Sequence, residues 1–420
     1  MASRPIVINI QGDDSNLRKT LKGAAGRVEG FAKKVGALGV KAGAAFGVVS
    51  SAVAVGGVKA FSDFQAGMNE VLTLIPEAGA EAFGELGDQV KDFSKEFGVL
   101  PEKTIPALYQ ALSAGVPKDN VFEFLEVAQK AAKGGVTDLE TAVDGLSSVI
   151  NAYGGPAMMD MERASDLLFT AVKLGKTDFT QLSDSIFQVA PIASAVGVPF
   201  ENLTAMFANL TAQGVPTSVA ATQMKGALAE LAKEGTKADT AFRDLNGVGL
   251  QGFLENGGTF EEALMTLKDG ADEAGISVLD LFGSVEAGQA ILALTADGGE
   301  KLSETLEAMG DSAGATTTAF DTMDSGLKAN LDKIKANLKV LSIEVGEKLA
   351  PFIERFTDAL VTGFSNVDEI VGTVKDTALD FAKKVKEKAT PIIKGIADAF
   401  EAVSEKGLEA YDTVYTYLAP

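Results

Sequence analysis

Apolar residues recur along most of this chain at steps of three and four, the spacing that places them on one face of an α-helix. A clear example begins at Leu139, because Leu139, Val143, Leu146 and Ile150 share one helical face. An alternating pattern typical of a β-strand occurs only at residues 5–10. We therefore expect an all-α protein, with a multi-helix and repeat-like body, long heptad-patterned helices and a short N-terminal strand.

Short breaks of glycine and valine, followed by proline or threonine, separate the predicted helices in the middle of the chain. Glycine is the favoured left-handed residue just past a helix end, and proline suits the first turn of the next helix. The predicted repeat-boundary turns lie at Gly115, Pro117, Gly135, Gly197, Pro199 and Gly214. Because equivalent turns recur at an offset of about 80 residues, residues 62–310 are predicted to form a body of helical repeats.

The region before this body is first basic and then rich in glycine and alanine. Residues 1–32 predict the short strand and a basic amphipathic helix, and residues 33–61 predict a hydrophobic helical segment. Small residues in that segment fall at four-residue intervals, which lets two helix backbones approach closely. They are Gly39, Gly43, Gly47 and Ser51. Two interpretations stay open: a helix buried in a bundle of small residues, and a segment that also enters a bilayer.

Residues 311–420 are predicted to form a heptad helix followed by a helical tail. The apolar seam of that helix consists of Leu327, Leu331, Ile334, Leu338, Leu341 and Val345. Proline interrupts helices, so Pro351 is expected to break the pattern after Ala350. Such a seam supports either self-association as a coiled coil or packing within one chain.

Charge is divided unevenly along the chain. Residues 1–60 hold nine Lys or Arg against three Asp or Glu, a net charge of +6, whereas the remaining residues hold 28 against 55, a net charge of −27. An acidic body repels phosphates, so we expect no sequence-specific nucleic-acid binding. The first residues lack the basic start and apolar run of a signal peptide, which favours a cytoplasmic product.

Little in the sequence indicates an active site. The chain has no His, Cys or Trp, which excludes imidazole and thiolate catalysis and the metal sites that use those ligands. Carboxylates such as Asp138, Glu140 and Asp144 could serve acid–base chemistry, but their positions suit helix starts and solvated faces. The Gly-Lys-Thr of residues 175–177 resembles the end of a phosphate-binding loop, yet Thr170 stands where that loop requires glycine. We predict no catalytic residue, no metal site and no cofactor.

Several phrases of the chain resemble the core region of phage tail tape measure proteins. They lie at residues 107–116, 141–154, 188–217 and 341–351, and the opening strand and basic helix are also similar. The resemblance implies a structural virion protein without enzymatic activity. Such a protein occupies the lumen of the tail tube, sets tail length, templates tube assembly and is ejected ahead of the DNA.

The resemblance also implies partners and locations. The partners would be the tail tube protein, tail assembly chaperones and tail-tip or baseplate proteins, and the protein itself would form a homotrimer. It would occur in the host cytoplasm during assembly, in the virion afterwards, and transiently in the host envelope. There residues 33–61 would contact the host membrane and aid genome passage.

Two departures from the family pattern keep other interpretations open. Tape measure proteins are often much longer, so 420 residues suggest a short tail or part of a longer product, and no peptidoglycan hydrolase module is visible. The alternative from another class is a helical membrane pore-forming or translocator protein, motivated by the basic N-terminal arm and the small-residue stripe. A carboxylate glycosidase is a third hypothesis, because that chemistry needs only two Asp or Glu residues.

Overall fold

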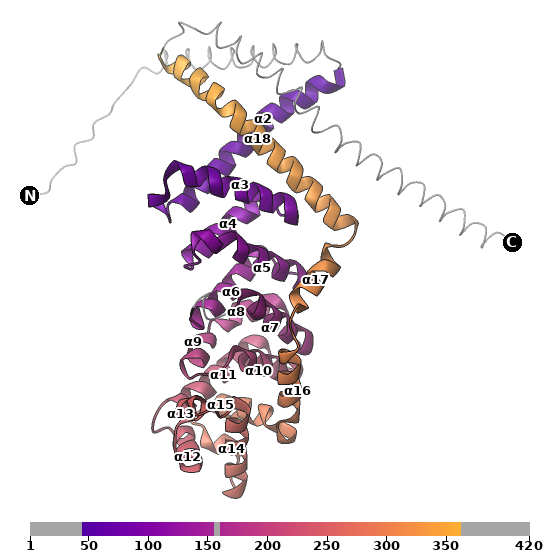
Figure 1. Ribbon diagram of the computed structural model, residues 1–420. Coiled ribbons are helices and arrows are strands. Elements are labelled where there is room, and N and C mark those ends of the chain that lie inside the picture. Colours follow the sequence, from indigo (N-terminus) through magenta and orange to yellow (C-terminus); the bar gives the residue numbers. More distant parts are fainter. Residues whose placement is uncertain (1–43, 155–159, 363–420) are drawn as a thin grey trace, which may run out of the picture. The chain divides into compact units, whose positions relative to one another are not determined.

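A computed structural model describes residues 44–154 and 160–362 (Figure 1). Every regular element in these ranges is a helix, so the prediction of an all-α body is confirmed for the described part of the chain. The predicted strand at residues 5–10 and the helical tail after residue 362 lie outside the described residues. The contacts divide the chain into two units: unit 1 contains residues 1–63 and 341–420, and unit 2 contains residues 64–340.

The α-helices of the described ranges vary in length from 6 to 36 residues. In chain order they are α2 (Ala44–Leu72), α3 (Gly79–Phe97), α4 (Pro101–Ser113), α5 (Val121–Gly134), α6 (Leu139–Ala152), α7 (Met161–Leu174), α8 (Phe179–Ile186), α9 (Ala190–Ala195), α10 (Phe200–Ala212), α11 (Thr217–Ala232), α12 (Lys237–Asn246), α13 (Leu250–Glu255), α14 (Phe260–Glu273), α15 (Val285–Leu294), α16 (Glu300–Gly310), α17 (Ala315–Asp324) and α18 (Leu327–Thr362). Short 3-10 turns in the described ranges are η1 (Pro76–Ala78), η2 (Lys118–Asn120), η3 (Val278–Leu281) and η4 (Ala296–Gly299).

Unit 2 is built from two rows of stacked helices. In row A, α4, α6, α8 and α11 pack each on the next, and in row B, α5, α7 and α10 do the same. The helices of row B begin at Val121, Met161 and Phe200, which are 40 and 39 residues apart. One helix of row A and the next helix of row B form a helical hairpin. Each hairpin therefore buries its apolar face against its neighbours, as in an α-solenoid. Two such hairpins have the length of the predicted repeat of about 80 residues, which itself stays a prediction.

The core of unit 2 lies between the two rows. Its largest side chains without exposed surface include Phe124 and Phe207 from row B and Leu146 and Phe179 from row A. These positions belong to the apolar faces of amphipathic helices, which have to be buried against a second layer. The stack is therefore held together mainly by apolar contacts between the rows.

After α15 the chain turns back along row B. We call residues 300–326, which contain α16 and α17, the return segment. Helix α16 packs on α10 and α7, and α17 packs on α7 and α5, as the orange ribbon in Figure 1 shows. The start of α18 then pairs Lys339 with Glu102 of α4. Because Gly67 of α2 lies against Ile105, also on α4, the chain enters and leaves unit 2 at the same helix.

Unit 1 contains a close crossing of α2 and α18. A Cβ atom added to Gly57 would lie 2.8 Å from Val345 Cγ1, and one added to Gly346 would overlap the carbonyl oxygen of Gly57. Glycine is required on both helices because their backbones nearly touch. Helix α18 continues through Pro351 to Thr362, so the predicted interruption is wrong. The cause is that a helix of 36 residues tolerates the loss of one backbone hydrogen bond.

Candidate functional site

Three of the predicted turn glycines adopt the left-handed conformation just after a helix. The φ angles are +92° at Gly115, +82° at Gly197 and +93° at Gly214. After each glycine, a valine N–H bonds to a carbonyl five residues back, over 2.9 to 3.1 Å. This is the Schellman arrangement that ends helices. Pro117 and Pro199 follow as the N-cap residues of η2 and α10, so these turns position the hairpins of the stack.

The turn after α5 differs from the other three. Gly135 has a φ of −84°, and the left-handed residue is Val136, with a φ of +56°. Gly135 is nevertheless needed, because a Cβ atom there would lie 2.7 Å from the Cβ atom of Phe179. Val136 is β-branched and 76% exposed, so its left-handed backbone is strained and no packing of its side chain compensates.

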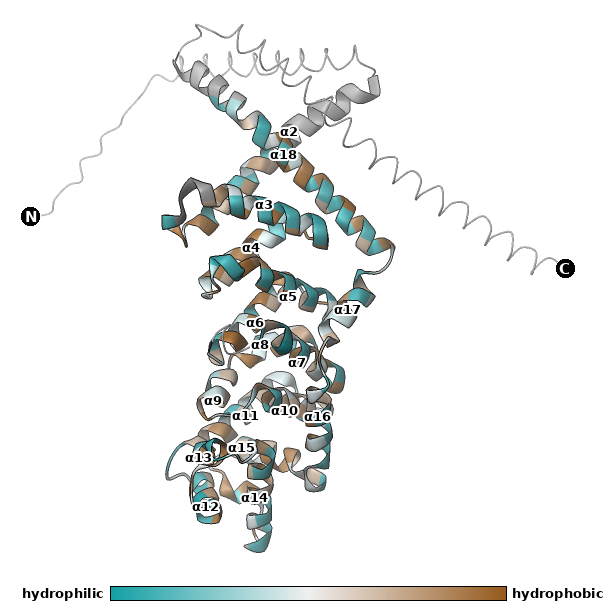
Figure 2. Cartoon of the chain, viewed as in Figure 1, coloured by the Kyte–Doolittle hydropathy of each residue, from teal (hydrophilic) through white to brown (hydrophobic). Residues whose placement is uncertain are grey.

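The predicted heptad seam lies on a face of α18 that is partly exposed. Leu327 is 64% exposed, Leu331 is 44% exposed and Leu338 is 42% exposed, whereas Ala329 and Ala336 are buried. The small alanines therefore make the intrachain contact. Ile334 and Leu341 are half-buried, and Val345 is buried at the crossing in unit 1. Figure 2 shows hydrophobic residues interspersed with hydrophilic ones along α18.

The small-residue stripe cannot be placed in the same detail. Gly39 and Gly43 lie outside the described residues, while Gly47 and Ser51 belong to the first part of α2, where only the backbone is described. No helix among the described residues is long and apolar enough to cross a bilayer. The stripe therefore stays a prediction, and the close glycine contact that the structure does describe is at Gly57.

A carboxylate of α7 holds the start of α17. Asp166 accepts hydrogen bonds from the backbone N–H of Gly314 over 2.7 Å and of Thr316 over 2.9 Å. Gly314 is the N-cap of α17 and has no side chain with which to cap it. The hydroxyl of Ser165 also lies 2.9 Å from that of Thr316. Because negative charge stabilises a helix N-terminus, Asp166 acts as the missing cap from another helix.

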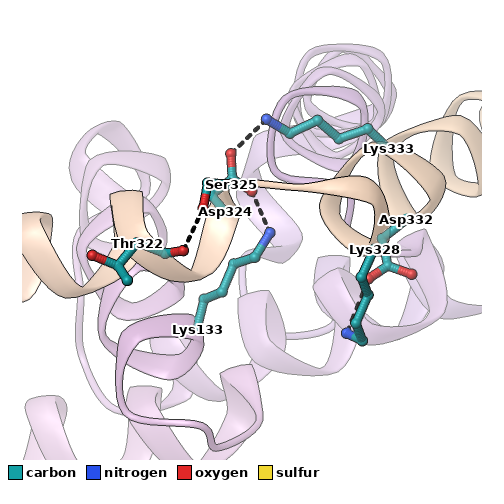
Figure 3. Close-up of polar contacts among 7 residues, drawn as sticks. All are labelled: Lys133, Thr322, Asp324, Ser325, Lys328, Asp332 and Lys333. Carbon is teal, nitrogen blue, oxygen red and sulfur yellow. Dashed lines mark hydrogen bonds and ion pairs between the residues drawn. The ribbon is translucent and has the colours of Figure 1, made fainter. Parts of the chain in front are cut away.

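A second carboxylate lies between two lysines at the end of α17 (Figure 3). Asp324 accepts hydrogen bonds from Lys133 of α5 and, over 2.7 Å, from Lys333 of α18. Burial alone would raise the pKa of Asp324, but the hydrogen bonds and positive charges of both lysines outweigh burial and lower it. The ammonium of Lys133 also lies 5.6 Å from the ring centre of Phe320. Asp324 thus links the return segment to α5 and to the start of α18.

Two of the carboxylates considered for catalysis make structural contacts. Asp138 accepts a hydrogen bond from the N–H of Thr141 as the N-cap of α6, and Asp144 accepts one from the side chain of Gln110. No group of three or more acidic residues in the described ranges could hold a metal ion. At residues 175–177, the Thr177 hydroxyl lies 2.7 Å from that of Thr217, which links two helix starts.

Sequence reasoning missed the residues that hold the return segment. Asp166 and Asp324 look like ordinary surface carboxylates, because their partners are up to 191 residues away along the chain. The only local signal was Gly314, a glycine at a helix start with no capping side chain. Gly57 and Gly346 were hidden among the many glycines of the chain.

Comparison with known proteins supports the resemblance. The family described as phage-related minor tail protein matches residues 87–283, which run from α3 to the turn before α15. A probable tape measure protein of Clostridium phage phiCD119 is 29% identical over 375 residues, covering 86% of this chain and 39% of that protein. The tape measure protein of Pneumococcus phage Dp-1 is 23% identical over 310 residues, covering 72% of this chain and 26% of that protein. No solved structure matches the chain.

The chain therefore spans about two fifths and about a quarter of the length of these two relatives. The similarity to each of them extends well beyond the residues that match the minor tail protein family. One relative is described as a tape measure protein and the other as a probable one, and the described ranges form the helical body that the resemblance implies. The chain is thus similar to phage tail tape measure proteins over most of its length.

Proposed function

We propose that this chain is a structural, non-enzymatic part of a phage tail and acts in the tape measure that sets tail length. The observation that carries the proposal is the similarity to two proteins described as tape measure proteins, over 86% and 72% of the chain. In this role the protein occupies the lumen of the tail tube, templates assembly of the tube and leaves ahead of the DNA. Its partners are the tail tube protein, assembly chaperones and tail-tip or baseplate proteins.

Unit 2 is proposed to be a folded module of this protein rather than the measuring segment. A continuous helix advances about 1.5 Å per residue, so length is measured best by extended helices. Unit 2 instead begins and ends at α4, because Gly67 and Lys339 both contact that helix. As long as it stays folded, it adds little length along the path of the chain. The measuring helices are therefore expected in α18 or in sequence such as the longer relatives contain.

We further propose that copies of the chain associate through the seam of α18. The seam residues have heptad spacing, and Leu327 and Leu331 remain exposed after Ala329 and Ala336 have packed within the chain. Burying leucines at heptad spacing between helices is the basis of coiled coils. Sedimentation equilibrium of the chain should give an assembly, with a homotrimer expected. Replacing both exposed leucines with glutamate should yield monomers.

Val285 provides a matched control for that measurement. It is 63% exposed and lies at the start of α15, away from the seam. A glutamate at Val285 should leave the assembly unchanged. If the chain is monomeric at all concentrations, or if the Val285 variant dissociates it equally, the seam does not mediate association.

The role of residues 33–61 in genome passage is also proposed rather than described, because most of this segment lies outside the described residues. Two measurements separate the tape measure role from that of a membrane pore-former. Purified virions should contain this chain together with tube and tip proteins. The isolated chain should not release dye from liposomes in their absence. Leakage by the chain alone, with none of it in virions, would favour the pore-former instead.

A further inference from the structure

The return segment is held on row B largely by polar contacts. Asn209 of α10 donates a hydrogen bond to the hydroxyl of Thr305 over 2.9 Å. Arg163 of α7 donates one to the hydroxyl of Ser312 over 2.7 Å. These bonds add to the cap that Asp166 provides and to the lysine contacts of Asp324. The segment is thus positioned by specific hydrogen bonds at several points along its length.

Apolar burial contributes less to the second half of this interface, where the partly buried Phe320 packs edge-on against Phe97. Helix α17 buries one of its ten residues, Thr316, whereas α10 of row B buries ten of its thirteen. In α16 the buried residues are Leu302 and Met309. The hydrophobic effect stabilises contacts in proportion to the apolar area that they remove from water. Removing α17 would therefore cost much less than removing a helix of row B.

The surface beneath the return segment is also suited to contact with water. Ser165 and Asp166 of α7 and Asn209 of α10 are buried polar residues whose partners are in the return segment. Buried polar groups need hydrogen-bond partners, and water can supply them when the segment leaves. Row B would thus keep its own apolar core after release.

Left-handed residues flank the return segment at both ends. Asp297, Gly298 and Gly299 have φ angles of +54°, +71° and +77° immediately before α16, and Gly326, between α17 and α18, has a φ of +102°. Added Cβ atoms on Gly298 and Gly326 would meet no neighbouring atom, whereas one on Gly299 would lie 3.0 Å from Met265 Sδ. A hinge needs only a few residues that can absorb changes in φ and ψ.

We propose that the return segment is a detachable strap, which swings away from row B about these two hinges while the two-row stack stays folded. The closed strap lies along row B between α15 and the start of α18. Released, its 27 residues could reach up to ~90 Å if fully extended, while α18 would keep its own ion pair between Lys339 and Glu102. The proposal concerns unit 2 alone and does not depend on the proposed role in tails.

Hydrogen exchange of the intact chain tests this proposal. Amides of α17 should exchange at least ~100-fold faster than those of α7 and α10, because local opening requires less free energy than unfolding of the stack. Low concentrations of urea should accelerate the core amides but hardly change those of α17, since opening exposes little surface. Equal exchange and equal urea dependence in α17 and α7 would overturn the proposal.

An engineered disulfide gives a second, independent test. A Cβ atom on Gly134 would lie 3.0 Å from that of Ala319, slightly closer than the ~3.5–4.5 Å of a disulfide. The chain has no cysteine, so Gly134→Cys with Ala319→Cys introduces one defined pair. Oxidation should slow exchange in α17 to the rate of α7, and reduction should restore it. The two single variants are the controls, and an oxidised pair that leaves α17 exchange unchanged contradicts the proposal.

Discussion

Replacing Asp166 with alanine should weaken the docking of α17 more than removal of an ordinary helix cap. The carboxylate accepts two backbone N–H groups, one from Gly314 at an exposed position and one from Thr316 at a buried position. A buried donor left without a partner costs about 1–3 kcal/mol, and loss of a helix cap costs about 0.5–2 kcal/mol. Water can reach Gly314, so we expect a total loss of about 2–4 kcal/mol in docking free energy.

The loss should be visible as faster hydrogen exchange across α17, together with a smaller decrease in the urea midpoint of the whole chain. Asp166→Asn keeps one oxygen acceptor and should lose about half as much. Asp160→Ala is the matched control, since Asp160 caps α7 by accepting from the N–H groups of Glu162 and Arg163. That variant should lower stability by about 0.5–2 kcal/mol without changing exchange in α17. If the alanine variants at 166 and 160 affect α17 equally, the cap from α7 does not hold this helix.

Three further predictions concern other positions of the two units. Asp324 has a lowered pKa, so its stabilising effect is complete above its unfolded pKa of about 3.9 and is lost as the pH falls through the lowered value. Acid should therefore favour opening of α17 and accelerate its hydrogen exchange. Asp324→Asn should abolish this pH dependence. Val136→Gly should raise stability by about 0.5–1 kcal/mol, because relief of about 1–2 kcal/mol of left-handed strain exceeds the entropic cost of glycine, and an unchanged urea midpoint would contradict this. Gly346→Ala should cost about 1–3 kcal/mol of stability in unit 1, since its Cβ atom would overlap the Gly57 backbone, whereas Gly310→Ala has open space and should not destabilise.

Local rules predicted the class of the fold and several of its turns. The glycines at 115, 197 and 214 are left-handed because a helix ends directly before them, and that relation needs only neighbouring residues. The turn after α5 departs from the pattern because Phe179 approaches Gly135, which moves the left-handed conformation to Val136. Such a contact depends on tertiary packing and cannot be read from the local sequence.

The sequence alone also could not predict which face of each helix packs within the chain. Heptad leucines predicted that the seam of α18 makes contacts, but Ala329 and Ala336 face the rest of unit 2 and leave Leu327 and Leu331 exposed. Hydrophobicity alone could not distinguish a seam that packs against another chain from a seam that packs within the same chain. The return segment is harder still, since Asp166 and its partners are 148 and 150 residues apart in sequence.

The central claim is that this chain acts in a tail-length ruler, and the length of assembled tails tests it most directly. Eight heptads, 56 residues, can be inserted in α18 after Glu354, which lies beyond both the crossing at Gly346 and the contacts of Lys339. At about 1.5 Å per residue, tails of the phage that carries the insertion should lengthen by up to ~84 Å in electron micrographs. Whole heptads keep the apolar seam in register. Assembled tails of unchanged length would contradict a measuring role for this part of the chain.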